Sequence, residues 1–302
     1  MLHYPVLLNE SINLLDLKKD GLYLDGTFGR GGHCSQILAA IGINGKVIAF
    51  DKDIEAINYA AINLSDSRLT LIHDSFCNFD NYIAPKSQFD GVILDLGISS
   101  PQIDDKNRGF SYNAEADLDM RMDNTKGTSA KDWVNSASEE QIADILWRYG
   151  EEKFSRRIAK NIVQERNKKQ IKTTKQLADI IKFSVLKSEK GQNPATRSFQ
   201  AIRIYINNEL GDLEMFLNKI STYLKVGSRV VVISFHSLED RIVKNYFKQL
   251  VQGESLPKWV NAKIEEQKYK VIAKKIRPSI GEVEENIRSR SAILRCLEKI
   301  KE

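Results

Sequence analysis

Two absences in the 302-residue sequence exclude whole classes of protein: cysteine is scarce, and no hydrophobic run is long. No apolar stretch reaches the roughly 18 residues that a membrane-spanning helix needs, so we expect no membrane partner. The three cysteines lie far apart, at positions 34, 77 and 296, and form neither a disulfide framework nor a zinc pattern. The first residues also lack the charged and apolar regions of an export signal. Together these features predict a cytoplasmic protein.

Other absences narrow the chemistry. The four histidines are scattered along the chain, so we expect no metal site. The spacing G-x-G-x-x-G of nicotinamide-dependent oxidoreductases is missing, and so is the pair H-x-E and P-C-x-x-C of zinc base deaminases. No heptad pattern marks a dimer interface, which leaves a homodimer open.

A glycine-rich turn is the most informative feature that is present. Four glycines lie within residues 25–33 (DGTFGRGGH), between an apolar run that predicts a buried strand and residues 34–41, which predict a helix. Glycines in such a turn let the backbone adopt a positive φ and approach a ligand closely. The turn follows the expected first strand, and open α/β sheets bind nucleotides at that position. The spacing of Asp25, Gly29 and Gly31 resembles the first motif of S-adenosylmethionine-dependent methyltransferases.

Strand-like runs predict how the chain is organised. They cover residues 22–25, 46–51, 69–73, 91–96, 229–235, 269–276 and 291–297. Between them, the stretch from about residue 104 to residue 208 has only helical signals. This order predicts an α/β fold: a Rossmann-like seven-stranded methyltransferase sheet with an inserted all-helical domain. The expected parts are residues 1–103, the insert 104–208 and residues 209–302.

Capping boxes and charge characterise the expected insert. Ser138 with Gln141 and Thr173 with Gln176 predict two helix starts. Residues 153–190 carry twelve lysines and arginines against three acids, a net charge of +9, whereas the whole chain carries +5 and the remainder is therefore −4. Such a cluster can neutralise phosphates, which predicts a surface that holds a nucleic-acid backbone. The alternative is a solvated helix face.

Two acids end expected strands. Asp51 ends the second strand, where a carboxylate is suited to binding ribose hydroxyls. Asp95 ends the fourth strand and begins residues 95–98 (DLGI), which resemble a variant of the motif of amino-group methyltransferases. A carboxylate at this point can accept a hydrogen bond from the amine of a substrate base and draw lone-pair density towards a methyl donor. Asp95 could instead face the ammonium group of the cofactor or belong to a plain turn.

The chain resembles the RsmH family, also called MraW, almost from end to end. The matching segments are HYPVLLNE at residues 3–10, DGTFGRGGH at 25–33, DLGISSPQ at 95–102, RGFS at 108–111, LDMRMD at 118–123, YGEE at 149–152, NPATRSFQA at 193–201, SFHSLEDR at 234–241, EN at 285–286 and RSRS at 288–291. The resemblance implies a bacterial enzyme that methylates the exocyclic N4 amine of a cytidine in 16S rRNA, at the decoding centre of the small ribosomal subunit. It also implies S-adenosylmethionine as cofactor and a methyltransferase sheet with a helical insert. Cys34 is a mild departure, because a small hydroxyl residue is expected there.

Site residues follow from the resemblance position by position. It implies a catalytic role for Asp95 and cofactor contacts from Gly31, Gly32, His33, Asp51, Phe76, Asp95 and Gln102. The candidate RNA contacts are Arg156, Arg157, Lys168, Lys169, Arg197 and His236. Three of these have structural alternatives: His33 starts a helix, Phe76 suits a core, and His236 precedes an expected capping box of Ser237 and Asp240.

The sequence leaves open the roles of two segments and two alternative functions of the protein. The polar stripe of Thr196, Gln200, Arg203 and Asn207 either lines an RNA cleft or cross-links the insert to the sheet, and the second role is slightly favoured. Residues 118–123 suggest a loop pinned by ion pairs. A non-catalytic RNA-binding assembly factor and a methyltransferase acting on DNA or protein are the alternative functions.

Overall fold

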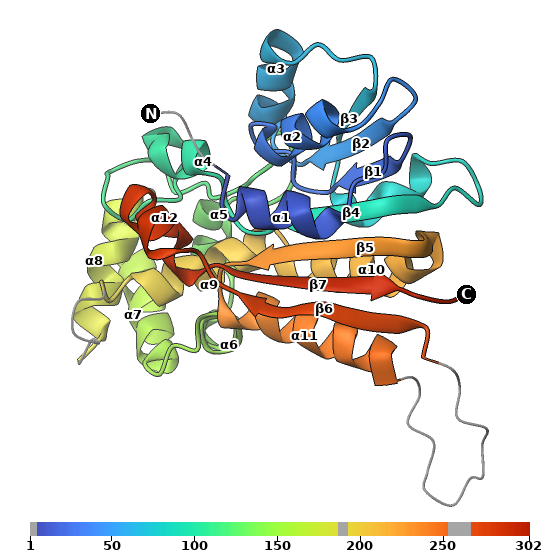
Figure 1. The fold of residues 1–302 in the computed structure, drawn as a ribbon. Helices are drawn as coiled ribbons and strands as arrows, with labels where there is room; N and C mark the ends of the chain where they lie inside the picture. The colour runs from blue at the N-terminus through green and yellow to red at the C-terminus, as the bar shows by residue number, and fades with distance from the viewer. Residues whose placement is uncertain (1–4, 187–192, 253–266) are drawn as a thin grey trace, which may run out of the picture. The chain divides into compact units, whose positions relative to one another are not determined.

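The computed structural model describes residues 5–186, 193–252 and 267–302, and the chain divides into two compact units (Figure 1). The sheet unit consists of Met1–Gly97 together with Leu210–Glu302, and the insert consists of Ile98–Glu209. Each unit has a hydrophobic core of its own. None of the helices within the described ranges combines the length and apolar character needed to cross a membrane.

Seven strands form the sheet, in the order β3-β2-β1-β4-β5-β7-β6. They are β1 (Leu22–Asp25), β2 (Lys46–Asp51), β3 (Leu69–His73), β4 (Phe89–Asp95), β5 (Leu224–Ser234), β6 (Tyr269–Ile276) and β7 (Ile293–Lys299). The first five run parallel, whereas β7 is antiparallel to both β5 and β6. The predicted α/β fold and its seven strand-like runs are confirmed. Because β1 to β5 are parallel, their carboxyl ends lie at one edge of the sheet.

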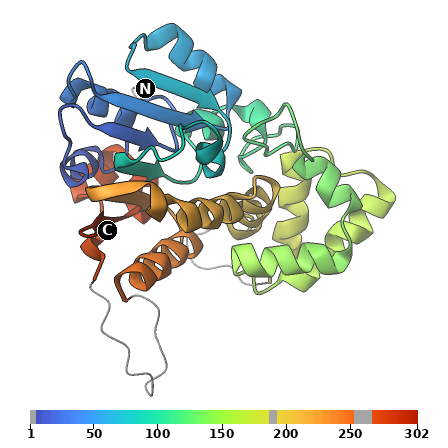
Figure 2. The same ribbon diagram turned by 90° about the vertical axis from the view of Figure 1, so that its right-hand side faces the viewer.

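Helices cover both faces of this sheet because successive strand side chains point to opposite faces. In β5, Val231 and Ile233 join the core that includes residues of α1 and α2, and Val230 and Val232 join the core formed with α10 and α11. Figure 2 shows α10 and α11 side by side. The helices are α1 (Leu8–Leu15), α2 (Gly32–Ala40), α3 (Ile54–Asn63), α10 (Glu209–Ile220), α11 (Ser237–Gln252) and α12 (Ile280–Glu285), with 3₁₀ turns η1 (Phe76–Asn81), η3 (Ser221–Tyr223) and η4 (Ile287–Ser291).

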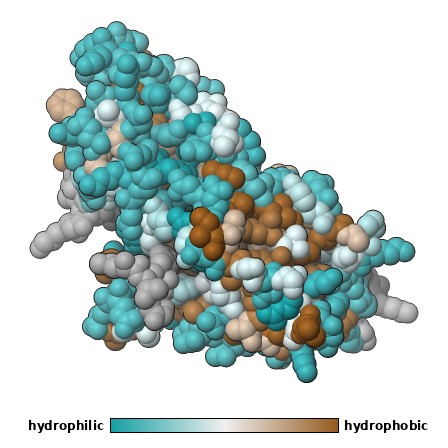
Figure 3. Space-filling model, turned by 90° about the horizontal axis from the view of Figure 1, so that it is seen from above, coloured by the Kyte–Doolittle hydropathy of each residue, from teal (hydrophilic) through white to brown (hydrophobic). Residues whose placement is uncertain are grey.

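Some large apolar side chains of the sheet unit remain at the surface. Ile43 and Ile62 are 88% and 83% exposed. The view from above in Figure 3 shows apolar residues gathered in one area of this face, with polar residues over most of the rest. Singly exposed apolar residues are ordinary on protein surfaces and do not by themselves indicate an interface.

The insert is helical, as predicted. Its helices are α4 (Ser100–Asp104), α5 (Ala130–Ser136), α6 (Glu139–Gly150), α7 (Ser155–Lys168), α8 (Thr174–Ser184) and α9 (Thr196–Ile206), with a 3₁₀ turn η2 (Lys106–Arg108). Both predicted capping boxes are confirmed: Ser138 with Gln141 starts α6, and Thr173 with Gln176 starts α8. α6 and α9 pack closely, since a Cβ on Gly150 would lie 2.8 Å from the backbone oxygen of Arg197.

Residues 118–123 form a loop that hydrogen bonds hold within the insert. Met120 is buried with a φ of +61°. Asn207, the C-cap of α9, donates to the carbonyl of Met120 at 2.7 Å and accepts the N–H of Met122 at 2.6 Å. The expected ion pairing is present, because Arg121 lies 2.7 Å from Asp119. Within the described part of the insert, Asn207 therefore supports this loop.

Candidate active site

The glycine-rich turn joins β1 to α2 at the edge where the parallel strands end. Gly29 and Gly31 have φ angles of +56° and +76°, which residues with side chains rarely adopt. A Cβ on Gly31 would lie 2.8 Å from the ring of Phe28, so the turn is closed on that side. A Cβ on Gly29 would meet no described atom within 4 Å. The turn is therefore open at Gly29, where a ligand has room to approach.

Asp51 holds this turn from the end of β2. Its Oδ2 accepts the N–H of Gly29 at 2.7 Å, and its Oδ1 accepts the N–H of Asp53 at 2.8 Å. Desolvation, partly offset by these two hydrogen bonds, raises the pKa of Asp51 to about 6. Each carboxylate oxygen still has a lone pair for a further donor, which is what the predicted ribose contact requires.

Asp25 and Asp95 end the adjacent strands β1 and β4. Asp25 Oδ1 accepts the N–H of Thr27 at 3.1 Å, and the N–H of Asp95 donates to Thr27 Oγ1 at 2.6 Å. The other oxygen of Asp25, Oδ2, and the Oδ1 of Asp95 are buried and have no hydrogen-bond partner among the described residues. His33 Nδ1 lies 3.8 Å from Asp95 Oδ2. Asp25 is 1% exposed and the Asp95 side chain 23%, so one buried and one half-buried carboxylate are only partly compensated by the protein.

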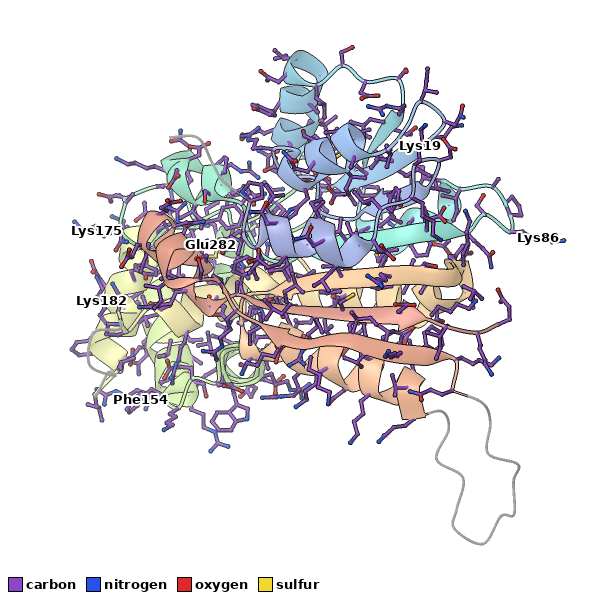
Figure 4. All side chains as sticks on the ribbon, viewed as in Figure 1. Lys19, Lys86, Phe154, Lys175, Lys182 and Glu282 are labelled. Carbon is purple, nitrogen blue, oxygen red and sulfur yellow. The ribbon has the colours of Figure 1, made fainter. Side chains whose placement is uncertain are left out.

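The pKa values of both acids reflect this environment. Desolvation raises the pKa of Asp25 to about 7. It also raises the pKa of Asp95 well above its ordinary value, with further contributions from the charges of Asp25, Glu239 and Glu282. Glu282, labelled in Figure 4, lies on α12, and its Oε1 accepts the N–H of Leu7 at 2.8 Å. Acids that interact in this way, two of them buried, fit a cationic ligand, and S-adenosylmethionine carries both an ammonium and a sulfonium group.

Phe76 lies beside the start of the glycine-rich turn. It is the first residue of η1, shortly after β3. A Cβ on Gly26 would lie 3.0 Å from the Cβ of Phe76, so Phe76 packs against the start of the glycine-rich turn. Its ring meets the ring of Phe216 edge-on, with 5.3 Å between centroids. The side chain is only partly buried, and its contact with adenine stays a prediction.

The sheet unit thus brings together all the predicted cofactor residues except Gln102; they are Gly31, Gly32, His33, Asp51, Phe76 and Asp95. Gln102 belongs to the insert. It is buried there, and its Oε1 accepts the N–H of Ser99 at 2.9 Å in the capping box of α4. A contact between Gln102 and the cofactor stays a prediction.

His236 lies before α11, but the capping box predicted beside it is wrong. α11 begins at Ser237, so Ser237 and Asp240 do not occupy the N-cap and N3 positions. Glu239 takes over the capping role, because its Oε2 accepts the N–H of Phe235 at 2.8 Å. The Oε1 of Glu239 lies 3.1 Å from His236 Nε2. The N–H of Glu239 also donates to His236 Nδ1 at 3.5 Å, at the first turn of α11. An RNA contact from His236 stays a prediction.

The other candidate RNA residues lie in the insert. Arg156 and Arg157 are at the start of α7, Lys168 ends it and Lys169 follows directly. Arg156 and both lysines are exposed, whereas Arg157 and Arg197 of α9 are half-buried. Residues 187–190, the end of the basic segment, lie outside the described residues. The four candidates of α7 and its flank therefore lie at the two ends of this helix, about 16 Å apart along its axis.

Sequence reasoning misses Glu239 and Glu282, although the charges of both act on Asp95. Glu282 is three residues after Ser279, the N-cap of α12, and this spacing predicts a capping glutamate rather than a site acid. The SFHSLEDR segment includes Glu239 but does not indicate which of its acids turns inward. Only the folding of residues 210–302 onto β4 brings these charges near Asp95.

The strand order, with β7 antiparallel to both its neighbours, the glycine-rich turn after β1 and the acids that end β2 and β4 define an S-adenosylmethionine-dependent methyltransferase. The MraW methylase family matches residues 1–300, and the chain belongs to this family. A protein of Marinomonas sp. (strain MWYL1) called ribosomal RNA small subunit methyltransferase H is 50% identical over 305 residues, covering 99% of this chain and 97% of its own length. A protein of the same description from Neisseria meningitidis serogroup B is 46% identical over 303 residues, covering 98% of this chain and 92% of its own length.

Two solved structures with a similar fold are more distant. An rRNA methylase from Clostridium thermocellum is 15% identical with a TM-score of 0.47, over 100% of this chain and 99% of that one. A methyltransferase from Streptococcus mutans in complex with SAH is 14% identical with a TM-score of 0.43, over 99% of both chains.

Proposed function

We propose that this protein transfers a methyl group from S-adenosylmethionine to the exocyclic N4 amine of a cytidine in 16S rRNA, at the decoding centre. The observation that carries the proposal is the pair of undercompensated acids, buried Asp25 and half-buried Asp95, each with one buried oxygen that has no described partner, beside a glycine turn that is open at Gly29. Membership of the MraW methylase family and the descriptions of the relatives support a small-subunit rRNA substrate.

The residues of the chain divide the task between cofactor and base. S-adenosylmethionine, when bound, supplies a methyl group that its sulfonium charge makes electrophilic. The turn around Gly31 and the Asp51 carboxylate would hold its adenosine part, and Asp25 would balance positive charge. Asp95 accepts a hydrogen bond from the substrate amine, which orients the nitrogen and leaves a carboxylate in place for the proton that the amine loses.

Access to the base requires a change in the RNA. The N4 amine of a stacked, paired cytosine is out of reach of a carboxylate at the end of a buried strand, so the base must leave its stack. The basic residues at the ends of α7 hold the surrounding phosphates while it does so. In this proposal the insert recognises RNA and the sheet unit carries out transfer.

The decisive experiment measures transfer of labelled methyl from S-adenosylmethionine to small ribosomal subunits from cells that lack this protein, with naked 16S rRNA beside them. Digestion to nucleosides should place the label in N4-methylcytidine. Label in another nucleoside would contradict the cytidine assignment. Label in neither RNA, with cofactor binding intact, would contradict the substrate assignment and leave the methyltransferase class standing.

A further inference from the structure

Two loops of the sheet unit that carry predicted cofactor residues meet on one carboxylate of α10. Lys52 directly follows Asp51, and Ser75 directly precedes Phe76. Lys52 Nζ lies 2.5 Å from Asp212 Oδ2, and Ser75 Oγ donates to the same oxygen at 2.5 Å. A single oxygen atom therefore ties the end of β2 to the start of η1.

The setting of Asp212 makes this tie strong. Asp212 is only 6% exposed and Ser75 is 8% exposed, so little water competes for their hydrogen bond. The Lys52 side chain is 23% exposed, which places its ammonium group at the boundary of the core. Hydrogen bonds to charged groups are worth more than neutral ones, and a buried charge needs such partners.

The same helix supports Phe76 directly. Phe216 lies one turn after Asp212 on α10, and its ring packs edge-on against Phe76 with 5.3 Å between centroids. Helix residues four apart lie on one face, so α10 presents a carboxylate and an aromatic ring to the same loop. The loop around Phe76 is thus held at two adjacent points.

We propose that Asp212 is a positioning residue for the adenosine half of the cofactor site. It keeps Asp51 and Phe76 at a fixed separation, so that the groups predicted to contact ribose and adenine are in place before the ligand arrives. The inference rests on the proposed use of S-adenosylmethionine. Preorganisation of this kind raises affinity, because a site that is already ordered loses less conformational entropy when the ligand binds.

The test measures binding of S-adenosylhomocysteine and of 5′-methylthioadenosine by isothermal titration calorimetry to Asp212→Asn, Ser75→Ala and wild-type protein. The second probe keeps the adenosine half and lacks the amino-acid half. Asp212→Asn should raise the Kd of both probes by about tenfold, and Ser75→Ala, which leaves the Lys52–Asp212 pair intact, by about threefold. Equal factors for the two probes place the defect on the adenosine side.

Asp80→Asn is the matched control. Asp80 pairs with Lys219 at 2.8 Å and so also joins η1 to α10, but both side chains are more exposed and Asp80 lies four positions after Phe76. Asp80→Asn leaves intact the hydrogen bond from Lys219 to the carbonyl of Cys77, the residue after Phe76. Its Kd values should stay within about twofold of wild type. Thermal unfolding confirms that each variant is folded at the titration temperature. If Asp212→Asn is not folded, the Kd values of Ser75→Ala decide the test.

Three outcomes would overturn the inference while leaving the proposed function intact. The first two are unchanged Kd values in the folded variants and an equal loss of affinity in Asp80→Asn. A loss for S-adenosylhomocysteine without one for methylthioadenosine would also overturn it. Wild-type protein that binds neither probe would instead contradict the cofactor assignment and this inference with it.

Discussion

At the scale of single residues, Asp95 is the side chain on which the proposed chemistry depends. Asp95→Asn keeps the size of the side chain and removes the carboxylate that accepts the proton of the amine. The rate of methyl transfer should therefore fall by at least about 100-fold. The measurement is the single-turnover rate of methyl transfer. Asp90→Asn is the control, because Asp90 lies on the same strand but its carboxylate binds Lys18 and Lys225. Transfer by Asp95→Asn at near the wild-type rate would remove Asp95 from the mechanism.

The raised pKa of Asp25 predicts how the free energy of unfolding depends on pH. Folding raises its pKa from 3.8 to about 7, because the buried carboxyl group holds its proton. Below about pH 4 the group is protonated in both states; between about pH 4 and 7 only the unfolded chain releases the proton, so the free energy of unfolding falls as pH rises. Asp25→Asn should remove this contribution, and its unfolding free energy should fall less across that window, by about a few kcal/mol.

Urea unfolding at several pH values measures the difference. Asp66→Asn is a suitable control, because the Arg68 guanidinium holds the pKa of Asp66 at about 2 and its titration lies below the window. Parallel pH profiles for wild type and Asp25→Asn would show that the carboxyl group does not hold its proton as inferred.

At the scale of elements, the turn between β1 and α2 depends on backbone conformation as well as on contacts. Gly31→Ala places a Cβ 2.8 Å from the Phe28 ring at a φ of +76°, so both strain and a clash oppose it. Gly127→Ala has a similar φ of +78° and meets nothing within 4 Å. We expect about 1 kcal/mol lost for Gly127→Ala and about 2 to 3 kcal/mol for Gly31→Ala, measured by urea unfolding. Equal losses would mean that the ring yields freely.

Element prediction from the sequence succeeded where the pattern was local. The strands β1, β2, β3 and β6 have the predicted bounds, because each is a short run with a turn at either side. β5 begins at Leu224 rather than at residue 229, since Gly227 interrupts the apolar run without ending the strand. The failed capping box at Ser237 has a similar cause, because two acids compete within one turn and packing selects Glu239.

At the scale of the whole molecule, charge is divided between the two units. Reversing Arg156, Arg157, Lys168 and Lys169 to glutamate should weaken binding to 16S rRNA and reduce the slope of log K against log salt by about 3, because about one counterion is released per neutralised phosphate. Filter binding across a salt series measures both. The same change at Lys244, Lys248, Lys270 and Lys274, which are exposed in the sheet unit, is the control. An unchanged slope in the insert variant would identify its basic residues as a solvated face.

The candidate site could be predicted in part for the same physical reasons. The glycine-rich turn and the strand-ending acids Asp51 and Asp95 are readable because parallel strands all end at one edge of a sheet. The sequence did not decide between the two roles of the polar stripe that begins at Thr196. In the structure, the last residue of this stripe, Asn207, supports the 118–123 loop through contacts with Met120 and Met122. Helical spacing shows which residues share a face but not what that face meets.

The amino-acid sequence by itself determined the α/β fold, the helical insert, the family and the glycine-rich turn with Asp25, Asp51 and Asp95, because these depend on hydrophobic period, local caps and motifs of adjacent residues. Only the tertiary structure decided that Glu239 and Glu282 raise the pKa of Asp95, and that Asp212 joins Lys52 to Ser75. Ser75 and Asp212 are 137 positions apart in the chain. No local pattern encodes such a contact, since it exists only once α10 has packed on the sheet.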